Sequence, residues 1–195
     1  LEFRRVLFRS ALRTQLAGIE AVAPQVSKSM TVVANGRNWQ TSVVGTNTDY
    51  FTIDNRTFED GRNFEEAEER AGSAVCVIGS TVANELFGTT QNVVGRQIRT
   101  GGFSCRVIGL LKTKGTAAMG GDQDDLLVMP LKSVQRRILG DNRVSALLIR
   151  INADSDRERL KTAVKDLMRE RRSLSSGDDD NFQIMDTAEI AAKVA

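Results

Sequence analysis

The chain has 195 residues, enough for one large domain or two small ones. Lys and Arg total 27 against 25 acidic residues, and 5% of the residues are aromatic, so neither the clustered basic charge nor the stacking platforms of a nucleic-acid-binding protein are expected. The sequence has no histidine, which excludes Ser-His-Asp and Cys-His catalysis within the chain and removes the commonest zinc ligand.

The N-terminal residues "LEFRRVLFRS" are arginine-rich and show no helix or strand pattern, so we expect residues 1–10 to be a non-native leader. Apolar residues at helical spacing from Leu12 onward then predict a short amphipathic helix that ends near Val22, where Pro24 stops it. No apolar run approaches the roughly 20 residues of a membrane-spanning helix. No signal peptide is visible either.

Two β-hairpins are predicted by their turn residues. In "TVVANGRNWQTSVV" the Asn35-Gly36 pair separates two β-rich runs. In "VVGRQIRTGGFSCRVIGLLK" the turn is Gly101-Gly102, and the flanking residues alternate with a period of two. Both segments therefore read as antiparallel strand pairs.

Between the hairpins, "AVCVIG" predicts a buried strand. Ser80 is suited to cap a helix through "TVANELF", and Gly88 to end it. Farther on, "LLVMP" predicts a strand, followed by a short helix that ends at Gly140. "VSALLIRI" predicts a strand buried on both faces, because its apolar run is almost continuous.

The strongest helix signal begins at Ser155 and Glu158, which form a capping box before a clean apolar stripe. "FQIM" predicts a further strand and "TAEIAAKVA" the start of a helix. This β-α-β-α-β order, preceded by a hairpin-rich insert at about residues 51–116, predicts the α+β class.

Three aspartates, Asp122, Asp124 and Asp125, stand in "MGGDQDDLLVMP". A magnesium site needs carboxylates that converge on one ion, usually beside substrate phosphates. The alternation in "DQDD" places the side chains on both sides of an extended segment, and no P-loop is present to hold a nucleotide. The pattern favours a solvated loop or a docking surface over a metal site. The run Asp178–Asp180 has the same interpretation.

The only two cysteines, Cys76 and Cys105, each lie in a predicted strand. They are either two buried thiols or a disulfide, which by the chain-entropy argument would add roughly 3 to 5 kcal/mol. The single Trp39 is either an exposed anchor for a partner or a half-buried residue beside the hairpin. No G-x-G-x-x-G motif supports a dinucleotide site. We therefore assign no catalytic, cofactor-binding or metal-binding residue.

The order of the motifs resembles the periplasmic core domain of MacB-like ABC transporter permeases. The similarity covers about residues 11–195, and each motif is weak alone but the series is specific. The motifs are "AVAPQVS", "GRNWQTSVVGTNTDYFTI", "FEDGRNF", "AVCVIGSTVANELFG", "VVGRQIR", "FSCRVIGLLKTKG", "DQDDLLVMPLKSVQRRILG" and "DDNFQIMDTAEIA".

This resemblance implies two subdomains: a porter-like β-α-β layer from residues 11–50 and 117–195, and an inserted, mostly β subdomain from residues 51–116. It implies a non-enzymatic domain on the periplasmic side of an inner-membrane permease that works as a dimer. Such permeases couple an ATPase domain, absent from this chain, to export of macrolides, peptides or lipoproteins, often with a periplasmic adaptor protein. The chain is then expected to be an excised domain that transmits conformational change.

Two alternatives stay open. A lipoprotein-release or cell-division type permease shares the general architecture and differs in substrate. A free-standing Asp-dependent metal enzyme would need the aspartates to gather around a bound ion. Under the resemblance, the three aspartates of "DQDD" are expected to cap turn amides or to face an adaptor or the second protomer.

Overall fold

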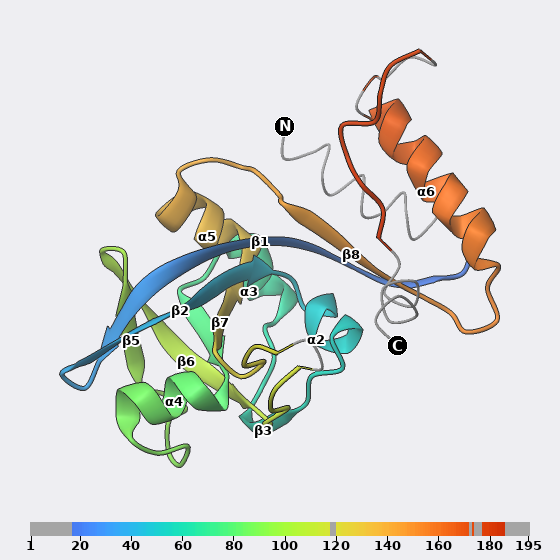
Figure 1. The fold of residues 1–195 in the computed structure, drawn as a ribbon. Coiled ribbons are helices and arrows are strands. Elements are labelled where there is room, and N and C mark those ends of the chain that lie inside the picture. The colour runs from blue at the N-terminus through green and yellow to red at the C-terminus, as the bar shows by residue number, and fades with distance from the viewer. Residues whose placement is uncertain (1–16, 118–119, 172, 174–176, 186–195) are drawn as a thin grey trace. The chain divides into compact units, whose positions relative to one another are not determined.

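The computed structural model describes residues 17–117, 120–171, 173 and 177–185, and Figure 1 shows its elements. The strands are β1 (Ile19–Ala34), β2 (Arg37–Thr46), β3 (Phe58–Gly61), β4 (Val75–Ile78), β5 (Gln97–Thr100), β6 (Phe103–Leu111), β7 (Leu126–Pro130) and β8 (Ala146–Ile151). The helices are α2 (Asp49–Ile53), α3 (Glu66–Ala71), α4 (Ser80–Phe87), α5 (Leu131–Val134), the π-helix η1 (Gln135–Leu139) and α6 (Arg157–Arg171). The expected α+β class is confirmed.

Six strands pair in a closed ring, in the order β1, β2, β7, β4, β6, β5 and back to β1. Val32 of β1 shows the closure, because it lies opposite Trp39 of β2 on one side and Thr100 of β5 on the other. The β2–β7 and β4–β6 pairs are parallel, and the other pairs of the ring are antiparallel. β3 joins β6 and β8 joins β1 outside the ring. Closure leaves few strand edges exposed.

The sheet has an apolar core on each side, as the alternation along β7 shows. Leu127 and Met129 face the interior of the ring, whereas Leu126 and Val128 face outward. The inner core consists of Val26, Val32, Ala34, Val43, Cys76, Ile78, Val82, Ala83, Leu86, Val93, Ile98, Cys105, Val107, Leu110, Leu127, Met129 and Val134. The outer core consists of Ala23, Val44, Tyr50, Phe51, Phe64, Val75, Val77, Ile108, Leu111, Leu126 and Val128. Helix α4 contributes to the inner core and α2 to the outer one.

Both predicted hairpins are confirmed. Asn35 and Gly36 have φ of 51° and 71° at the β1–β2 turn, and Gly101 and Gly102 have 53° and 90° at the β5–β6 turn. Positive φ at both central residues matches the right-handed twist of paired strands. The predicted strands β4 and β7 and the end of α4 at Gly88, which has a left-handed backbone, are confirmed as well.

The predicted helix ending near Val22 is wrong in its described part, where the chain is already strand β1. Pro24 lies inside this strand and does not end an element. Side chains satisfy the backbone there: Val22 N–H donates to Asp49 Oδ2 at 3.2 Å, and Val22 C=O accepts from Asn47 Nδ2 at 2.9 Å. Pro24, which has no N–H, is tolerated here because the pairing of β1 with β2 starts only at Val26.

Both serine caps predicted for the helices are also wrong. Helix α4 has Gly79 as its N-cap, and Ser80 is already helical. At the start of α6, the Asp156 carboxylate accepts from the Arg159 N–H at 3.0 Å, so the residue after Ser155 caps the helix. Aspartate and serine cap helices about equally well, and Ser155 is followed directly by Asp156.

Two predicted strands differ from the structure. β8 is a strand, but residues 147–151 are half-buried and Ala146 is exposed, because β8 pairs with β1 at the margin of the sheet. Residues 182–185, "FQIM", form no strand. The predicted helix at "TAEIAAKVA" and the predicted leader at residues 1–10 lie outside the described residues.

By its internal contacts the chain forms two compact units: unit 1 is Leu1–Glu20 with Arg150–Ala195, and unit 2 is Ala21–Ile149. Strands from residues 51–116 share one sheet with β2 and β7. The predicted boundaries of a porter-like part and an insert therefore differ from those of the compact units, and that subdivision stays a prediction. None of the described helices has the length and apolar character needed to cross a membrane.

Candidate functional site

The aspartates lie in the connection between β6 and β7, here called the acidic loop (residues 112–125). The loop doubles back on itself through a bridge between Thr116 and Asp122 and through the Gln123 N–H, which donates to Gly115 C=O at 3.1 Å. Residues 118 and 119 of this loop lie outside the described part. A short hairpin therefore leads the chain from β6 back to the start of β7.

Asp124 holds this hairpin at its base. Its side chain is buried, with 2% of the residue exposed. The carboxylate accepts from Lys114 N–H at 2.9 Å and from Gly115 N–H at 2.8 Å. A buried carboxylate that accepts several backbone hydrogen bonds is well satisfied by the protein itself. Asp124 is therefore a clamp that joins the two sides of the loop.

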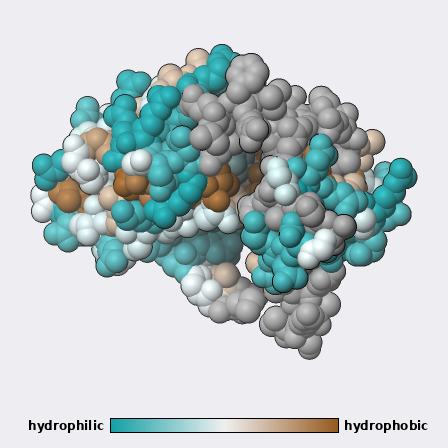
Figure 2. All heavy atoms as spheres, turned by 90° about the horizontal axis from the view of Figure 1, so that it is seen from above, coloured by the Kyte–Doolittle hydropathy of each residue, from teal (hydrophilic) through white to brown (hydrophobic). Residues whose placement is uncertain are grey.

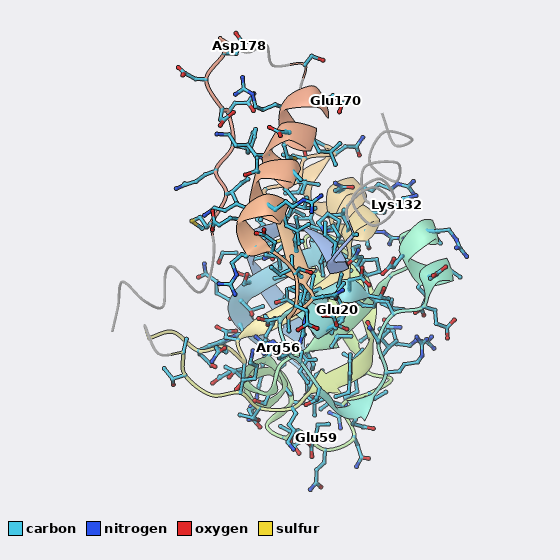
Figure 3. All side chains as sticks on the ribbon, turned by 90° about the vertical axis from the view of Figure 1, so that its right-hand side faces the viewer. Glu20, Arg56, Glu59, Lys132, Glu170 and Asp178 are labelled. Carbon is cyan, nitrogen blue, oxygen red and sulfur yellow. A yellow bond between two sulfur atoms is a disulfide. The ribbon has the colours of Figure 1, made fainter. Side chains whose placement is uncertain are left out.

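A buried arginine completes the clamp. Arg56, labelled in Figure 3, has 5% of its side chain exposed and places NH1 3.6 Å from Asp124 Oδ1. Its Nε donates to Asp54 Oδ2 at 2.6 Å, and Lys114 Nζ donates to Asp54 C=O at 2.8 Å. Four charged residues thus tie the end of α2 to the acidic loop. A buried charge needs such partners, because its removal from water is costly.

The other two aspartates of the loop turn to different partners. Asp122 Oδ2 accepts from Thr81 Oγ1 in the first turn of α4 at 2.5 Å, and its Oδ1 accepts from Asp124 N–H at 2.8 Å. Asp125 Oδ1 accepts from Trp39 Nε1 at 2.9 Å. Trp39 is half-buried and packs against the inner core. The structure therefore favours a half-buried residue of the hairpin over an exposed anchor for a partner.

The three carboxylates therefore diverge. One binds loop amides, one binds a helix start and one binds an indole, whereas a metal ion or an acid–base pair needs groups that face a common point. Among the residues that the structure describes, no group of three or more Cys, Asp or Glu side chains is placed to hold a metal ion. The expected role in capping turn amides is the one that Asp124 has in the structure.

Gly79 lets the acidic loop pass close to the sheet. A Cβ built on Gly79 would lie 2.0 Å from the backbone oxygen of Asp124, far inside van der Waals contact. The Gly79 N–H also donates to Leu126 C=O at 3.0 Å. The glycine at the end of β4 is thus required by a close backbone approach and not only by a turn.

Tyr50 of α2 lies in the outer core beside this network. Burial, and then the negative charge of Asp54, raise the pKa of its hydroxyl to about 12, although Arg56 opposes the shift. The phenol therefore stays neutral at all physiological pH values and is unsuited to act as a base. Its ring packs edge-to-face on Phe51, with centroids 5.5 Å apart.

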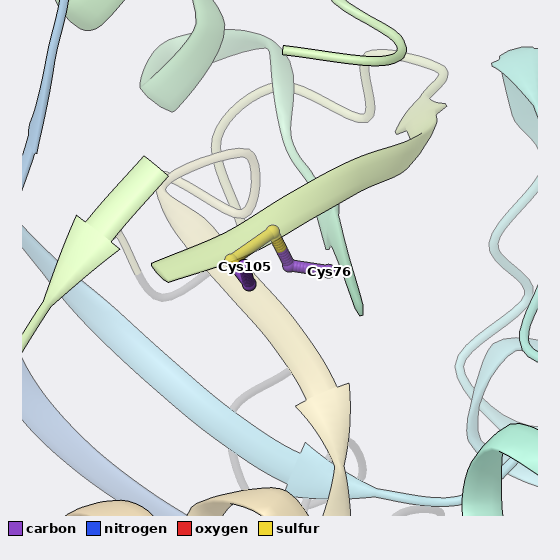
Figure 4. The surroundings of a disulfide bond; sticks show 2 residues. All are labelled: Cys76 and Cys105. Carbon is purple, nitrogen blue, oxygen red and sulfur yellow. A yellow bond between two sulfur atoms is a disulfide. The ribbon is translucent and has the colours of Figure 1, made fainter. Parts of the chain in front are cut away.

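The cysteines form a disulfide between β4 and β6, shown in Figure 4. The sequence is compatible with either a disulfide or two separate thiols, and the structure has the disulfide. A disulfide removes both nucleophilic thiolates, so neither cysteine is available for catalysis.

The second aspartate run belongs to unit 1 and lies beside α6. Asp180 is 2.9 Å from Lys165 Nζ and also pairs with Arg169. Lys165 first, and Arg169 second, hold the pKa of the Asp180 carboxyl below its usual value. Arg169 NH2 further donates to Asp178 C=O at 3.0 Å. These contacts fix the segment after α6 onto the helix, which the sequence pattern alone did not indicate.

Exposed hydrophobic side chains are sparse in the described part of the chain. On the face drawn in Figure 2, hydrophilic side chains predominate and hydrophobic ones show as separate spots. Met185 is the one large hydrophobic residue among those described that is exposed, at 68%. An open hollow of about 440 Å³ in unit 2 is lined by Gly61, Arg62, Val94, Gly95, Arg106, Val107 and Ile108. Arg62 there is engaged by Glu68 in two hydrogen bonds of 2.8 and 2.9 Å.

Sequence reasoning missed Arg56, Asp54 and Lys114, the partners of the clamp. They stand in separate segments, "TIDNRTF" and "LKTKG", with no local pattern that marks a charged residue as buried. A charged residue next to a strong apolar run was the only available signal, and it is common on solvated surfaces.

The similarity to known proteins agrees with the fold and with the order of the motifs. Residues 3–167 match the family described as the MacB-like periplasmic core domain. The macrolide export ATP-binding/permease protein MacB of Bdellovibrio bacteriovorus is 33% identical over 182 residues, which are 93% of this chain and 28% of that protein. MacB of Chlorobium luteolum is 32% identical over 172 residues, which are 88% of this chain and 26% of that protein. The chain thus spans less than a third of these relatives.

Solved structures share the fold. The periplasmic region of MacB from Actinobacillus actinomycetemcomitans superposes with a TM-score of 0.80 at 19% identity, covering 97% of this chain and 81% of that one. The extracellular domain of the noncanonic ABC-type transporter YknZ from Gram-positive bacteria gives 0.72 at 21% identity, covering 92% and 88%. With most of its length matched, the chain belongs to the MacB-like periplasmic core domain family and is an extracytoplasmic domain of an ABC transporter permease.

Proposed function

We propose that this domain transmits conformational change between the ATP-driven part of an efflux transporter and partners outside the membrane, without bond-making chemistry of its own. The observation that carries the proposal is the closed ring of six strands. A close-packed body of this kind deforms little, so a displacement applied at one place is passed on to another. The disulfide inside the ring and the Asp124 clamp outside it add to this stiffness.

The partners follow from the resemblance to the family. We propose an ATPase domain of the parent transporter, a second permease protomer and a periplasmic adaptor protein. The relatives are named as ATP-binding/permease proteins for macrolide export, which supports ATP-coupled export of macrolide-type substrates. Peptide- or lipid-type substrates are the alternative classes, and the parent transporter would reside in the inner membrane with this domain on its periplasmic side.

A structural role for the acidic loop supports a mechanical domain over an enzyme. Each carboxylate already has a partner within the protein, and those partners are a loop, a helix start and an indole. Such groups stiffen the scaffold. They do not present a shared proton or a common binding point to a substrate.

The test uses the parent transporter in membranes, with Asp124→Ala in this domain and Asp179→Ala as the matched control. Asp179 is an exposed aspartate in the second acidic run, so the control removes the same side chain without touching the clamp. We expect Asp124→Ala to retain ATP hydrolysis while macrolide export falls, and Asp179→Ala to match the wild type in both. Equal loss of hydrolysis and export would place the defect in assembly and contradict a transmission role. Turnover of a small molecule by the isolated domain would contradict the proposal outright.

A further inference from the structure

The disulfide between Cys76 and Cys105 joins the middle of β4 to the start of β6. The two residues are 29 positions apart and their Cα atoms lie at 5.8 Å, within the usual range for a bridged pair. Helix α4 and strand β5 lie in the segment that the bridge closes. Figure 4 shows the bridge lying between neighbouring strands and not at the end of a loop.

Both cysteines are sealed in the inner core. Cys76 is 0% exposed and Cys105 is 1% exposed. Ile98, which lies opposite Cys105 in the β5–β6 pair, and Val107, which lies opposite Cys76 in the β4–β6 pair, are each 0% exposed. Apolar side chains packed at interior density leave no room beside the sulfur atoms for a second molecule.

The chemistry of disulfide formation needs such room. One cysteine thiolate attacks a sulfur of an oxidised disulfide and forms a mixed disulfide, which releases one thiol of the oxidant. The second cysteine thiolate then attacks the mixed disulfide, forms the Cys76–Cys105 bond and releases the other thiol. Two protons and two electrons pass from the cysteines to the oxidant. The mixed intermediate carries a covalently attached partner on one sulfur, which the closed inner core cannot hold.

The chain also supplies no oxidant of its own. These are the only two cysteines among the 195 residues, so this segment has no other disulfide for exchange and only one pairing within it is possible. We propose that Cys76 and Cys105 are oxidised by an external disulfide oxidant that acts on the chain before the inner core closes, so that this domain is a folding substrate of extracytoplasmic thiol oxidation. The proposal goes beyond the transport function and does not depend on the exported substrate.

The first test measures how fast the bridge is reduced. The 195-residue chain is treated with dithiothreitol in native buffer and in urea, and free thiols are counted by the mass added with a maleimide. We expect reduction in native buffer to be slower by about 10³-fold or more, because only the rare unfolded fraction exposes the sulfur atoms. Rates within tenfold of one another would overturn the inference, since they would show that the native core admits a thiol reagent.

The second test measures how the bridge forms. The chain is exported to the periplasm of a Gram-negative host with or without its periplasmic thiol oxidase, and redox state and folded yield are recorded. We expect both to fall in the oxidase-deficient host. Restoration by oxidised glutathione in the medium would show that a small disulfide suffices, and restoration only by the enzyme would assign the step to a protein oxidant. Identical oxidation in both hosts without either oxidant would overturn the inference.

The double variant Cys76→Ala/Cys105→Ala is the matched control for the second test. Alanine keeps a small apolar group at both core positions and removes the redox chemistry. Its folded yield should be the same in both hosts, even where that yield is lower than the wild type. A yield that still depends on the oxidase would show an effect unrelated to this disulfide and would contradict the proposal.

Discussion

The two compact units hold their charged groups in opposite ways. In unit 2, Asp124 and Arg56 have 3% and 5% of their side chains exposed and work together with backbone amides in the interior. In unit 1, Asp180 and Lys165 pair with 24% and 50% of their side chains exposed, alongside α6. The first arrangement is shielded from salt, and the second is open to it.

This difference predicts where each unit is vulnerable. A buried charge that loses its partner stays in a poor solvent, so single substitutions in unit 2 should be costly. An exposed ion pair is worth little because water and ions compete with it, so unit 1 should respond weakly to substitution and visibly to salt and pH.

Asp124→Ala should give the largest loss. It leaves the amides of Lys114 and Gly115 without acceptors and Arg56 with one carboxylate partner fewer, so we expect the free energy of unfolding to fall by about 3 kcal/mol or more. Urea unfolding followed by Trp39 fluorescence measures the change. In unit 1, Asp179→Ala should change the midpoint little. Comparable losses for the two variants would abolish the contrast between the units.

Gly79→Ala should come second. The added Cβ would overlap the backbone oxygen of Asp124, so β4 and the acidic loop must separate at a cost of about 1 to 3 kcal/mol. Gly177→Ala in unit 1 is the control, because nothing lies within 4 Å of its Cβ. Thermal unfolding of both variants checks the prediction. A neutral Gly79→Ala would show that the loop is free to move away from the sheet.

Trp39→Phe should have a smaller effect of about 1 kcal/mol, because it removes the hydrogen bond to Asp125 and keeps most of the apolar packing. Asp125→Asn is the companion variant, since the amide oxygen still accepts from the indole. We expect it to cost less than Trp39→Phe in urea unfolding followed by circular dichroism. The reverse order would indicate that Asp125 has a more important partner than Trp39.

Local signals in the sequence predicted the elements whose geometry is local. The Asn35-Gly36 and Gly101-Gly102 pairs specify their turns through positive φ, and Gly88 ends α4 in the same way. Such features depend on a few neighbouring residues, which is why they are confirmed. The family, too, was predictable, because the order of many weak motifs carries information that no single motif has.

Features that depend on distant residues were not predictable. Pro24 reads as a helix stop, yet Val22 and Pro24 lie in a strand whose backbone groups are satisfied by side chains from residues 46–49. The closure of the ring through β1 and β5 likewise has no local signature. Arg56 follows α2 and Asp124 precedes β7, and the two are buried against each other only in the folded chain, so the clamp appears only once the fold is known.

The pH dependence of stability that comes from Asp180 should be the smallest of these effects, because its ion pairs with Lys165 and Arg169 are exposed. Its pKa is lowered by Lys165 and then Arg169, so the pair contributes stability above the ordinary aspartate pKa and loses it as pH falls through the lowered value. An NMR titration of the side-chain carboxyl gives the value directly. We expect Lys165→Gln to raise it, and added salt of about 1 M to do the same, because that concentration shortens the screening length to about 3 Å.

Glu68 of unit 2 is a second carboxyl whose pKa can be followed in the same titration for comparison. Its pKa is also lowered, first by the hydrogen bond from Arg62, and 15% of its side chain is exposed. The two-bond contact with Arg62 is short and less open to ions than the Lys165–Asp180 pair, so salt should raise the pKa of Glu68 less than that of Asp180. An equal or larger shift at Glu68 would show that screening does not follow burial here, and would remove the physical distinction between the two units.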